Sequence, residues 1–174
     1  MFEQVIIEKL KKIKILAMDV DGTMTDGAMY YSRDGESLKR FSTRDGMGIT
    51  LIHKAGIKSI MITSENSEIA KSRATKLNIE FVYLGTKDKS SDIINFCKKN
   101  NYTLDEICYI GDDINDELVM KLCGFSACPS DSVDIILQTA DYICKNKGGN
   151  GAIRELCEMI LLSQDKAISL KENW

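Results

Sequence analysis

Two aspartates, Asp19 and Asp21, are separated by a single residue. Asp19 directly follows the apolar run 15–18, and Asp21 directly precedes Gly22. Alternate residues of a strand point to the same face, and where the strand ends the chain can aim both carboxylates at one ligand. Neighbouring carboxylates repel each other unless a cation lies between them. The pair therefore predicts a cation site at the end of a strand.

Three further segments rich in β-forming residues also end in polar side chains. Thr63, Ser64 and Glu65 follow the first of these segments, Lys89 lies a few residues beyond the next, and Asp112 and Asp113 follow the last. Hydroxyls, an ammonium and an open N–H at Gly22 are groups that bind phosphoryl oxygens, whereas carboxylates are hard ligands that suit Mg²⁺. We therefore expect a magnesium-dependent phosphoryl site, with Gly22, Thr63, Ser64 and Lys89 binding phosphate.

The same residues predict a mechanism. An aspartate has a reference pKa of about 3.9, so Asp19 should be ionised at neutral pH and can attack phosphorus in line to form an aspartyl phosphate. Asp21 would protonate the departing alkoxide and later deprotonate the attacking water, a role worth about 10²–10⁴-fold in rate.

Each residue has a structural interpretation when taken alone. Asp-x-Asp-Gly also occurs in turns and calcium loops, Lys89 could lie on a solvated helix face, and Asp112 with Asp113 could stabilise a helix N-terminus. Their order and their common place at strand ends favour the catalytic interpretation. The single histidine, His53, argues against multi-histidine metal sites and is expected to pack in the core or lie on the surface.

The elements that would position these residues alternate along the chain. Strand-like segments cover 14–18, 58–63, 80–84, 107–110, 124–128 and 140–143, with helical periodicity between them and most clearly at the end, in Ile153, Leu156, Cys157, Ile160 and Leu161. This alternation predicts a Rossmann-like, three-layer α/β/α fold with a mainly parallel sheet. Ligands of such sheets bind beyond the carboxyl ends of the strands.

One segment interrupts the alternation. Residues 28–32 and 37–41 flank Arg33-Asp34-Gly35-Glu36, whose Asp-Gly pair is typical of a hairpin turn. A hairpin over about 27–41, without a separate cap domain, would act as a flap over the acidic pair, as an edge for self-association, or as both. The tail 163–174 is expected to begin as helix and then to fray.

Composition bounds the class of protein. With 174 residues and 44% apolar content, we expect a single domain over 1–174. A net charge of −3 without a basic stripe argues against a nucleic-acid partner. Residues 1–14 lack the pattern of a signal peptide or membrane span, and the six dispersed cysteines are typical of buried, reduced thiols. We therefore expect a cytoplasmic protein with no membrane partner.

The four groups, Asp19-Val20-Asp21-Gly22-Thr23, Thr63, Lys89 and 111–116, resemble the four motifs of the haloacid dehalogenase superfamily of phosphatases, in the family's order. The resemblance implies a nucleophile at Asp19, an acid and base at Asp21, and phosphate contacts from Thr63 and Lys89. It also implies that Mg²⁺ is held by Asp19, the Asp21 carbonyl and Asp112. Asp113 and Asp116 would orient waters on the metal.

A closer likeness covers 14–164 and rests on 25–27, 41–48 and 148–155. These segments resemble the capless subgroup of phosphatases that act on phosphorylated 2-keto-3-deoxy sugar acids. The subgroup includes octulosonate 8-phosphate and deoxynononate 9-phosphate phosphatases and a domain attached to acylneuraminate cytidylyltransferases. Its members are homotetramers in which hairpins associate and a neighbouring subunit helps to close each active site.

The residues expected to bind the sugar acid point to different branches of this subgroup. Glu65 and Lys76 resemble the nononate branch, and 142–145 resembles the cytidylyltransferase-attached domain. Arg44 resembles the octulosonate branch, whereas Asn150 departs from the Lys or Arg common both in that branch and in the cytidylyltransferase-attached domain. The balance favours a nononate or acylneuraminate 9-phosphate over octulosonate 8-phosphate, with Arg44, Glu65 and Lys76 binding the substrate.

Two other functions fit part of the pattern. A non-catalytic module that tetramerises or stabilises a separate acylneuraminate cytidylyltransferase has no need of Thr63, Lys89 and Asp112 together. A phospho-acceptor receiver domain also uses clustered aspartates, a threonine and a lysine, but its phosphorylated aspartate should follow the third strand, where Leu84-Gly85-Thr86 offers none. The pattern therefore favours a phosphatase.

Overall fold

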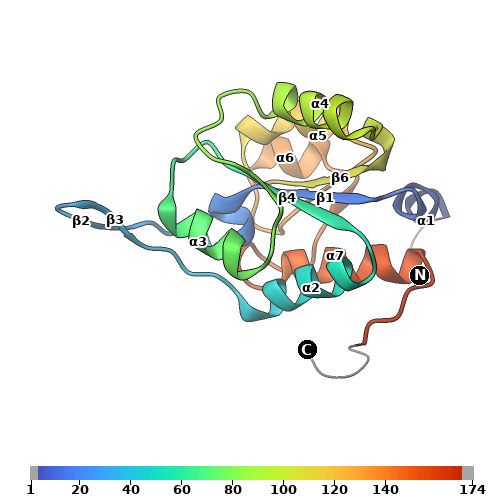
Figure 1. Cartoon of the computed structure of the whole chain (residues 1–174), viewed down its shortest axis with the longest axis horizontal. Helices are drawn as coiled ribbons and strands as arrows, with labels where there is room; N and C mark the ends of the chain where they lie inside the picture. The colour runs from blue at the N-terminus through green and yellow to red at the C-terminus, as the bar shows by residue number, and fades with distance from the viewer. Residues whose placement is uncertain (1–3, 170–174) are drawn as a thin grey trace.

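The computed structural model describes residues 4–169 and is built around a six-stranded parallel sheet (Figure 1). The strand order is β5-β4-β1-β6-β7-β8, and each strand lies within a segment predicted from the sequence. The strands are β1 (Ile15–Met18), β4 (Lys58–Ile62), β5 (Phe81–Tyr83), β6 (Ile107–Ile110), β7 (Phe125–Cys128) and β8 (Tyr142–Ile143). The predicted α/β fold with a parallel sheet is confirmed.

Helices cover both faces of the sheet (Figure 1). One face carries α1 (Gln4–Lys11), α2 (Thr43–Lys54), α3 (Glu68–Lys76) and α7 (Ala152–Ser163). The other face carries α4 (Lys89–Asn100), α5 (Glu117–Leu122) and α6 (Asp134–Thr139). The expected helix face of 153–161 is buried in α7, which confirms that prediction.

The central strand β1 is buried on both sides because its side chains alternate between the two helical layers. Ile15 and Ala17 belong to the hydrophobic cluster under α4, α5 and α6, whereas Leu16 and Met18 belong to the cluster under α2 and α7. No residue of this strand is therefore free for chemistry until the strand ends.

The register of the sheet brings three strand ends to one level. Met18 pairs with Met61 of β4 on one side and with Ile110 of β6 on the other. The residues that follow, from Asp19, Thr63 and Gly111 onward, consequently leave the sheet at its carboxyl edge. This is the edge at which open α/β sheets bind ligands.

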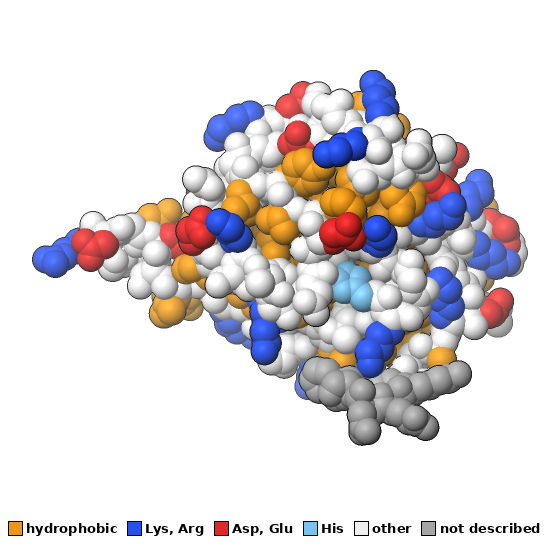
Figure 2. Space-filling view, in the orientation of Figure 1, with side chains coloured by type: hydrophobic (Ala, Val, Ile, Leu, Met, Phe, Trp, Pro, Cys, Tyr) orange, Lys and Arg blue, Asp and Glu red, His pale blue; other side chains and the backbone are white. Residues whose placement is uncertain are grey.

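A two-stranded hairpin projects from the body of the molecule, and its tip carries charged side chains (Figures 1 and 2). It consists of β2 (Tyr30–Ser32) and β3 (Gly35–Leu38), so the predicted hairpin is present. Its turn is shorter than expected, because Ser32 pairs with Gly35 and only two residues, Arg33 and Asp34, lie between the strands. Gly35 adopts a φ of 114°, which a residue with a side chain rarely does.

The chain after α7 differs from the sequence expectation. The helix ends at Ser163 rather than continuing into the tail, and Asp165 has a φ of 54°, which interrupts helical geometry. Gln164 instead ties the segment to the last turn of α1 and the residues after it, through Nε2 bonds to the carbonyls of Leu10 and Ile13. The far end of the predicted tail, including Trp174, lies outside the described residues.

Other expectations from composition can be compared with the fold. All six cysteines are free thiols, and all except Cys123 are buried, as predicted. His53 is partly buried, and its Nε2 lies 2.7 Å from Ser59 Oγ. Burial lowers the pKa of this imidazole. Within 4–169, no helix is long and apolar enough to cross a membrane.

Candidate active site

Asp19 is the first residue after β1, and it is only 5% exposed. Its backbone N–H still donates to the carbonyl of Ile110, at 3.0 Å, so the end of the sheet fixes its position. Its Oδ1 accepts a hydrogen bond of 2.5 Å from Lys89 Nζ. The result is a buried carboxylate with one oxygen held by a cation.

The turn Val20–Met24 wraps closely around the opposing loop at Asp112. Gly22 has a φ of 91°, and a Cβ there would lie 2.0 Å from Asp112 Oδ2, so only glycine fits. The Gly22 N–H is not open as the sequence suggested, because it donates to Thr25 Oγ1 at 3.2 Å. Thr23 Oγ1 donates to Asp112 Oδ1 at 2.9 Å and joins the two loops.

Lys89 is the first residue of α4, which begins there because Asp88 caps the helix by accepting from the N–H of Ser91. Its Nζ lies 2.5 Å from Asp19 Oδ1 and 2.6 Å from Asp116 Oδ1, and its side chain is 2% exposed. Burial acts to lower the pKa of this ammonium, but the two carboxylates raise it overall. Lys89 is thus a buried cation rather than a residue of a solvated face.

Asp112 and Asp116 bring two more carboxylates to Asp19. One oxygen of each of the three lies within 4.8 Å of the others. Asp116 is fully buried, and its Oδ1 also accepts from the hydroxyl of Tyr109 at 2.6 Å. Its Oδ2 accepts from the N–H of Asp112 at 3.0 Å, so Asp116 also holds the loop that carries Asp112.

The raised pKa values of Asp19 and Asp112 indicate that a cation would stabilise their ionised forms. Burial raises the pKa of Asp112 to about 6, with smaller contributions from neighbouring carboxylates. Burial and the Asp116 charge raise the pKa of Asp19 well above its usual range, although Lys89 acts against them. Lys89 supplies one positive charge and pairs with only two of the three carboxylates, so ionising all three leaves negative charge uncompensated. Hard oxygen ligands of this kind fit Mg²⁺.

Thr63 and Ser64 leave the sheet beside this cluster. Thr63 is buried, and its Oγ1 accepts from the N–H of Glu65 at 3.1 Å. A hydroxyl that accepts in this way keeps its own proton for another acceptor. Ser64 Oγ accepts from Asn115 Nδ2 at 3.3 Å, which links this loop to the loop of Asp112.

The side chains of four other predicted residues lie apart from the clustered carboxylates, although the backbone N–H of Asp113 donates to Asp116 Oδ2 at 3.3 Å. Asp113 is exposed and accepts from the N–H of Ile114 at 2.7 Å, as the cap of a short helical turn. Glu65 and Arg44 are exposed, and Lys76 is the last residue of α3. Within the part of the chain that the structure describes, no hydrogen bond or ion pair joins Arg44, Glu65 or Lys76 side chains to the cluster.

The structure adds residues that the sequence did not single out. Thr23 and Tyr109 bond Asp112 and Asp116, and Lys39 forms an ion pair with Asp21. Thr23 stands next to the acidic pair and could have been noticed. In the sequence, Tyr109 is typical of a buried strand residue and Lys39 of an exposed lysine on a hairpin. Their contacts with Asp116 and Asp21 are seen only in the folded structure.

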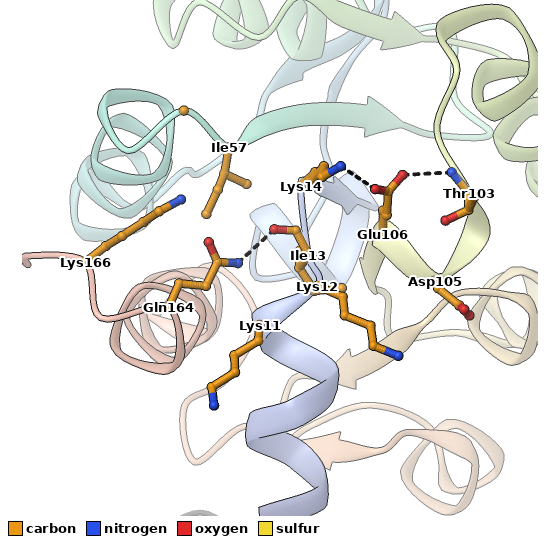
Figure 3. Close-up of a pocket in the computed structure, with 11 residues that line it drawn as sticks. Lys11, Lys12, Ile13, Lys14, Ile57, Thr103, Asp105, Glu106, Gln164 and Lys166 are labelled. Atoms are coloured by element: carbon orange, nitrogen blue, oxygen red, sulfur yellow. Dashed lines mark hydrogen bonds and ion pairs between the residues drawn. The ribbon is translucent and has the colours of Figure 1, made fainter.

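A cavity of about 490 Å³ lies at the opposite end of the sheet (Figure 3). Its lining comes from residues that precede the strands, such as Lys14 before β1 and Ile57 before β4. Lys14 is paired with Glu106 at 2.5 Å, and Gln164 binds the Ile13 carbonyl. The lining of this cavity includes four lysines and the carboxylates of Asp105 and Glu106, but none of the clustered aspartates, so we place the candidate active site at the carboxyl edge.

Comparisons with known proteins give the family that this chain resembles. Residues 50–156 match the haloacid dehalogenase-like hydrolase family. The chain is similar to the 3-deoxy-D-manno-octulosonate 8-phosphate phosphatase KdsC of Yersinia pestis, with 37% identity over 161 residues that cover 92% of this chain and 86% of that protein.

Two solved structures are also similar. The crystal structure of the Yersinia pestis phosphatase superposes with a TM-score of 0.91, at 37% identity, and covers 94% of this chain and 88% of that one. The Moraxella catarrhalis phosphatase, in complex with a magnesium ion, a phosphate ion and a KDO molecule, also gives 0.91, at 35% identity with 94% of both chains covered.

The raised pKa of Asp112 predicts how Mg²⁺ stabilises the fold. Without metal, the folded protein holds a proton that the unfolded chain releases above about pH 3.8, so stability should fall as pH rises from there to about 6. Mg²⁺ requires the deprotonated carboxylates, so it should raise the melting temperature more near pH 7.5 than near pH 5.

Thermal unfolding in MgCl₂ and in EDTA at the two pH values measures this difference. Asp112→Asn should remove most of the response to Mg²⁺, whereas the matched change Asp34→Asn at the exposed hairpin tip should keep it. An equal shift at both pH values, or a full response in Asp112→Asn, would contradict the assignment of Asp112 as a metal ligand.

Proposed function

The chain belongs to the haloacid dehalogenase-like hydrolases and is a phosphatase of that family, and we propose that it removes the terminal phosphate of a 2-keto-3-deoxy sugar acid. The proposal covers residues 1–174 as one domain. The observation that carries it is the buried Asp19, which shares Lys89 with Asp116 and lies within reach of Asp112 at the carboxyl edge of the sheet.

In the first half of the reaction, Asp19 attacks phosphorus. Lys89 holds Asp19 Oδ1, and we propose that Oδ2 forms the new bond to phosphorus. The bond between phosphorus and the sugar oxygen breaks, and Asp21 gives that oxygen a proton. Mg²⁺, held by Asp19, the Asp21 carbonyl and Asp112, would supply charge neutralisation for the phosphoryl group.

In the second half, Asp21 takes a proton from a water molecule that attacks the same phosphorus. The bond from phosphorus to Asp19 breaks, and inorganic phosphate leaves with the carboxylate restored. We further propose that Asp113 and Asp116 orient waters around the ion. For Asp116 the support is its burial against the cluster.

Phosphoryl oxygens would be bound by Thr63, Ser64 and Lys89, with Gly22 as a further donor. The Thr63 hydroxyl supports this role because it accepts from a backbone N–H and keeps its own proton for an anion. The N–H of Gly22 must give up its bond to Thr25 before it can contribute.

Octulosonate 8-phosphate is the first substrate that we propose, because the similar proteins act on it. The expected preference for a nine-carbon acid finds no support among them and rests on Glu65, Lys76 and the resemblance of 142–145 to the cytidylyltransferase-attached domain. Arg44, Glu65 and Lys76 stay proposed substrate-binding residues. We propose that Glu65 and Lys76 face the sugar acid, away from the carboxylate cluster, which fits the lack of any bond from these side chains to the cluster within residues 4–169.

A homotetramer formed through the hairpin is part of the same proposal. Tyr30, Tyr31 and Leu38 are 50%, 65% and 63% exposed there, and association would remove this apolar area from water. We propose a cytoplasmic location and neither nucleic-acid nor membrane partners. A non-catalytic role beside a cytidylyltransferase is disfavoured, because a scaffold gains nothing from burying Lys89 between two carboxylates.

Replacing Asp19 tests the nucleophile. Asp19→Asn keeps the shape but removes the attacking carboxylate, so phosphate release in Mg²⁺ should fall by at least about 10⁴-fold. A coupled assay for inorganic phosphate measures it, with Asp34→Asn as the matched change away from the site. Wild-type turnover by Asp19→Asn would show that another residue attacks.

Substrate choice is tested by kcat/KM for octulosonate 8-phosphate, deoxynononate 9-phosphate and acylneuraminate 9-phosphate in Mg²⁺. We expect octulosonate 8-phosphate to lead by about tenfold or more, because one or two substrate contacts separate such analogues. Glu65→Gly should lower only the nine-carbon values. A flat profile would remove the selective role of Glu65 and Lys76, and a leading nine-carbon substrate would contradict the proposed order.

A further inference from the structure

Lys39 lies directly after the hairpin strand β3, yet its side chain is 0% exposed. Its ammonium contacts two carboxylates: Asp21 Oδ1, and Glu36 Oε1 at 2.7 Å. Long charged side chains on a protruding hairpin normally stay in water, because burying a charge is costly unless it is paired. The position of Lys39 therefore requires an explanation.

The contact continues from the hairpin into the helical layer. Glu36 Oε2 accepts a hydrogen bond from Ser67 Oγ. Ser67 is buried and caps α3, since the same hydroxyl oxygen accepts from the N–H of Ala70 at 3.1 Å. A continuous chain of polar contacts thus leads from Asp21 through Lys39 and Glu36 to the start of a rigid helix. Lys39 therefore pairs with Asp21 on one side and is fixed on the other side by Glu36, which is itself bonded to Ser67.

The two oxygens of Asp21 have different surroundings. Oδ1 is bound by Lys39, whereas Oδ2 is buried and has no hydrogen-bond partner within residues 4–169. A buried acceptor without a partner is costly, so such an atom in a native site points to a ligand that completes it. The departing sugar oxygen, or the water that follows it, is such a ligand.

We propose that Lys39 is a positioning residue that fixes the Asp21 carboxylate by one oxygen and leaves the other oriented for proton transfer. The inference rests on the proposed function, in which Asp21 is the acid and base. Lys39 does not itself deliver the proton. Although burial acts to lower the pKa of its ammonium, the bonds to Asp21 and Glu36 raise it overall, so the group stays charged at neutral pH.

A purely structural role for Lys39 is the competing explanation, because the same contacts would also fasten the hairpin to the body. The two explanations differ in one observable. A misoriented proton donor slows esters whose leaving group needs a proton, and hardly affects esters whose leaving group departs as an anion. Loosening of the hairpin, or partial loss of folded enzyme, lowers both kinds of ester alike.

The test uses Lys39→Met and two aryl phosphates of similar shape, p-nitrophenyl phosphate and p-methylphenyl phosphate, in Mg²⁺. The nitrophenolate leaves readily, whereas the far more basic methylphenolate needs a proton. We expect kcat/KM for the methylphenyl ester to fall by about 10²-fold and that for the nitrophenyl ester much less, so that their ratio changes by about tenfold or more. Because both values come from one sample, the ratio does not depend on the fraction of active enzyme.

Glu36→Gln gives a milder version of the same change, because it removes the negative charge of the second partner of Lys39 while Lys39 and Asp21 stay in place. It should shift the ratio in the same direction by a smaller factor. Arg33→Met at the exposed hairpin tip is the matched control and should leave the ratio unchanged. An unchanged ratio in Lys39→Met and Glu36→Gln would overturn the inference while the phosphatase itself stands. A wild-type protein that hydrolyses neither ester nor any sugar-acid phosphate would overturn the proposed function first.

Discussion

Negative charge gathered at the carboxyl end of β1 is the constraint on which the rest of this structure depends. Asp19, Asp112 and Asp116 place carboxylate oxygens within 4.8 Å of one another in a largely buried region. Burial and mutual repulsion both oppose ionisation there. Lys89 supplies one buried positive charge that offsets part of this repulsion, and a bound divalent cation would neutralise the rest.

Asp19 and Asp21 are neighbours in sequence but belong to separate ionic clusters. Asp19 pairs with Lys89 from the start of α4, and Asp21 pairs with Lys39 from the base of the hairpin. The turn at Gly22 makes the separation possible, since it directs the chain away from the strand immediately after Asp21. Two carboxylates with different cations can then carry out different chemical tasks within one small site.

Much of this could be predicted from the sequence. The strands and their parallel order follow from apolar runs that alternate with helical periodicity, and such patterns are strong because both faces of the sheet are buried. Asp19, Lys89 and Asp112 were predicted to meet because the carboxyl ends of parallel strands share one edge. Their contacts confirm that they lie together, whereas the roles of Arg44, Glu65 and Lys76 stay predictions.

The features that the sequence did not predict depend on contacts between residues far apart in the chain, which no local sequence pattern shows. Lys39 meets Asp21 only because the hairpin folds back on its base, where Thr25 pairs with Phe41. The turn of the hairpin is two residues long instead of the expected four, because Gly35 pairs with Ser32 in the ladder of hydrogen bonds. The tail failed to extend α7 because Gln164 finds acceptors at the end of α1. Tertiary partners override local preference in each case.

The position of the phosphoryl group during turnover tests the central claim most directly. Enzyme hydrolysing its substrate in Mg²⁺ is quenched in acid, the acyl phosphate is reduced with borohydride, and the peptides are sequenced by mass spectrometry. Reduction converts a phosphorylated aspartate to homoserine, which is expected at position 19, with Asp21, Asp112 and Asp116 unmodified. Homoserine at one of those three positions, or intact aspartate at all four while phosphate is released, would contradict attack by Asp19.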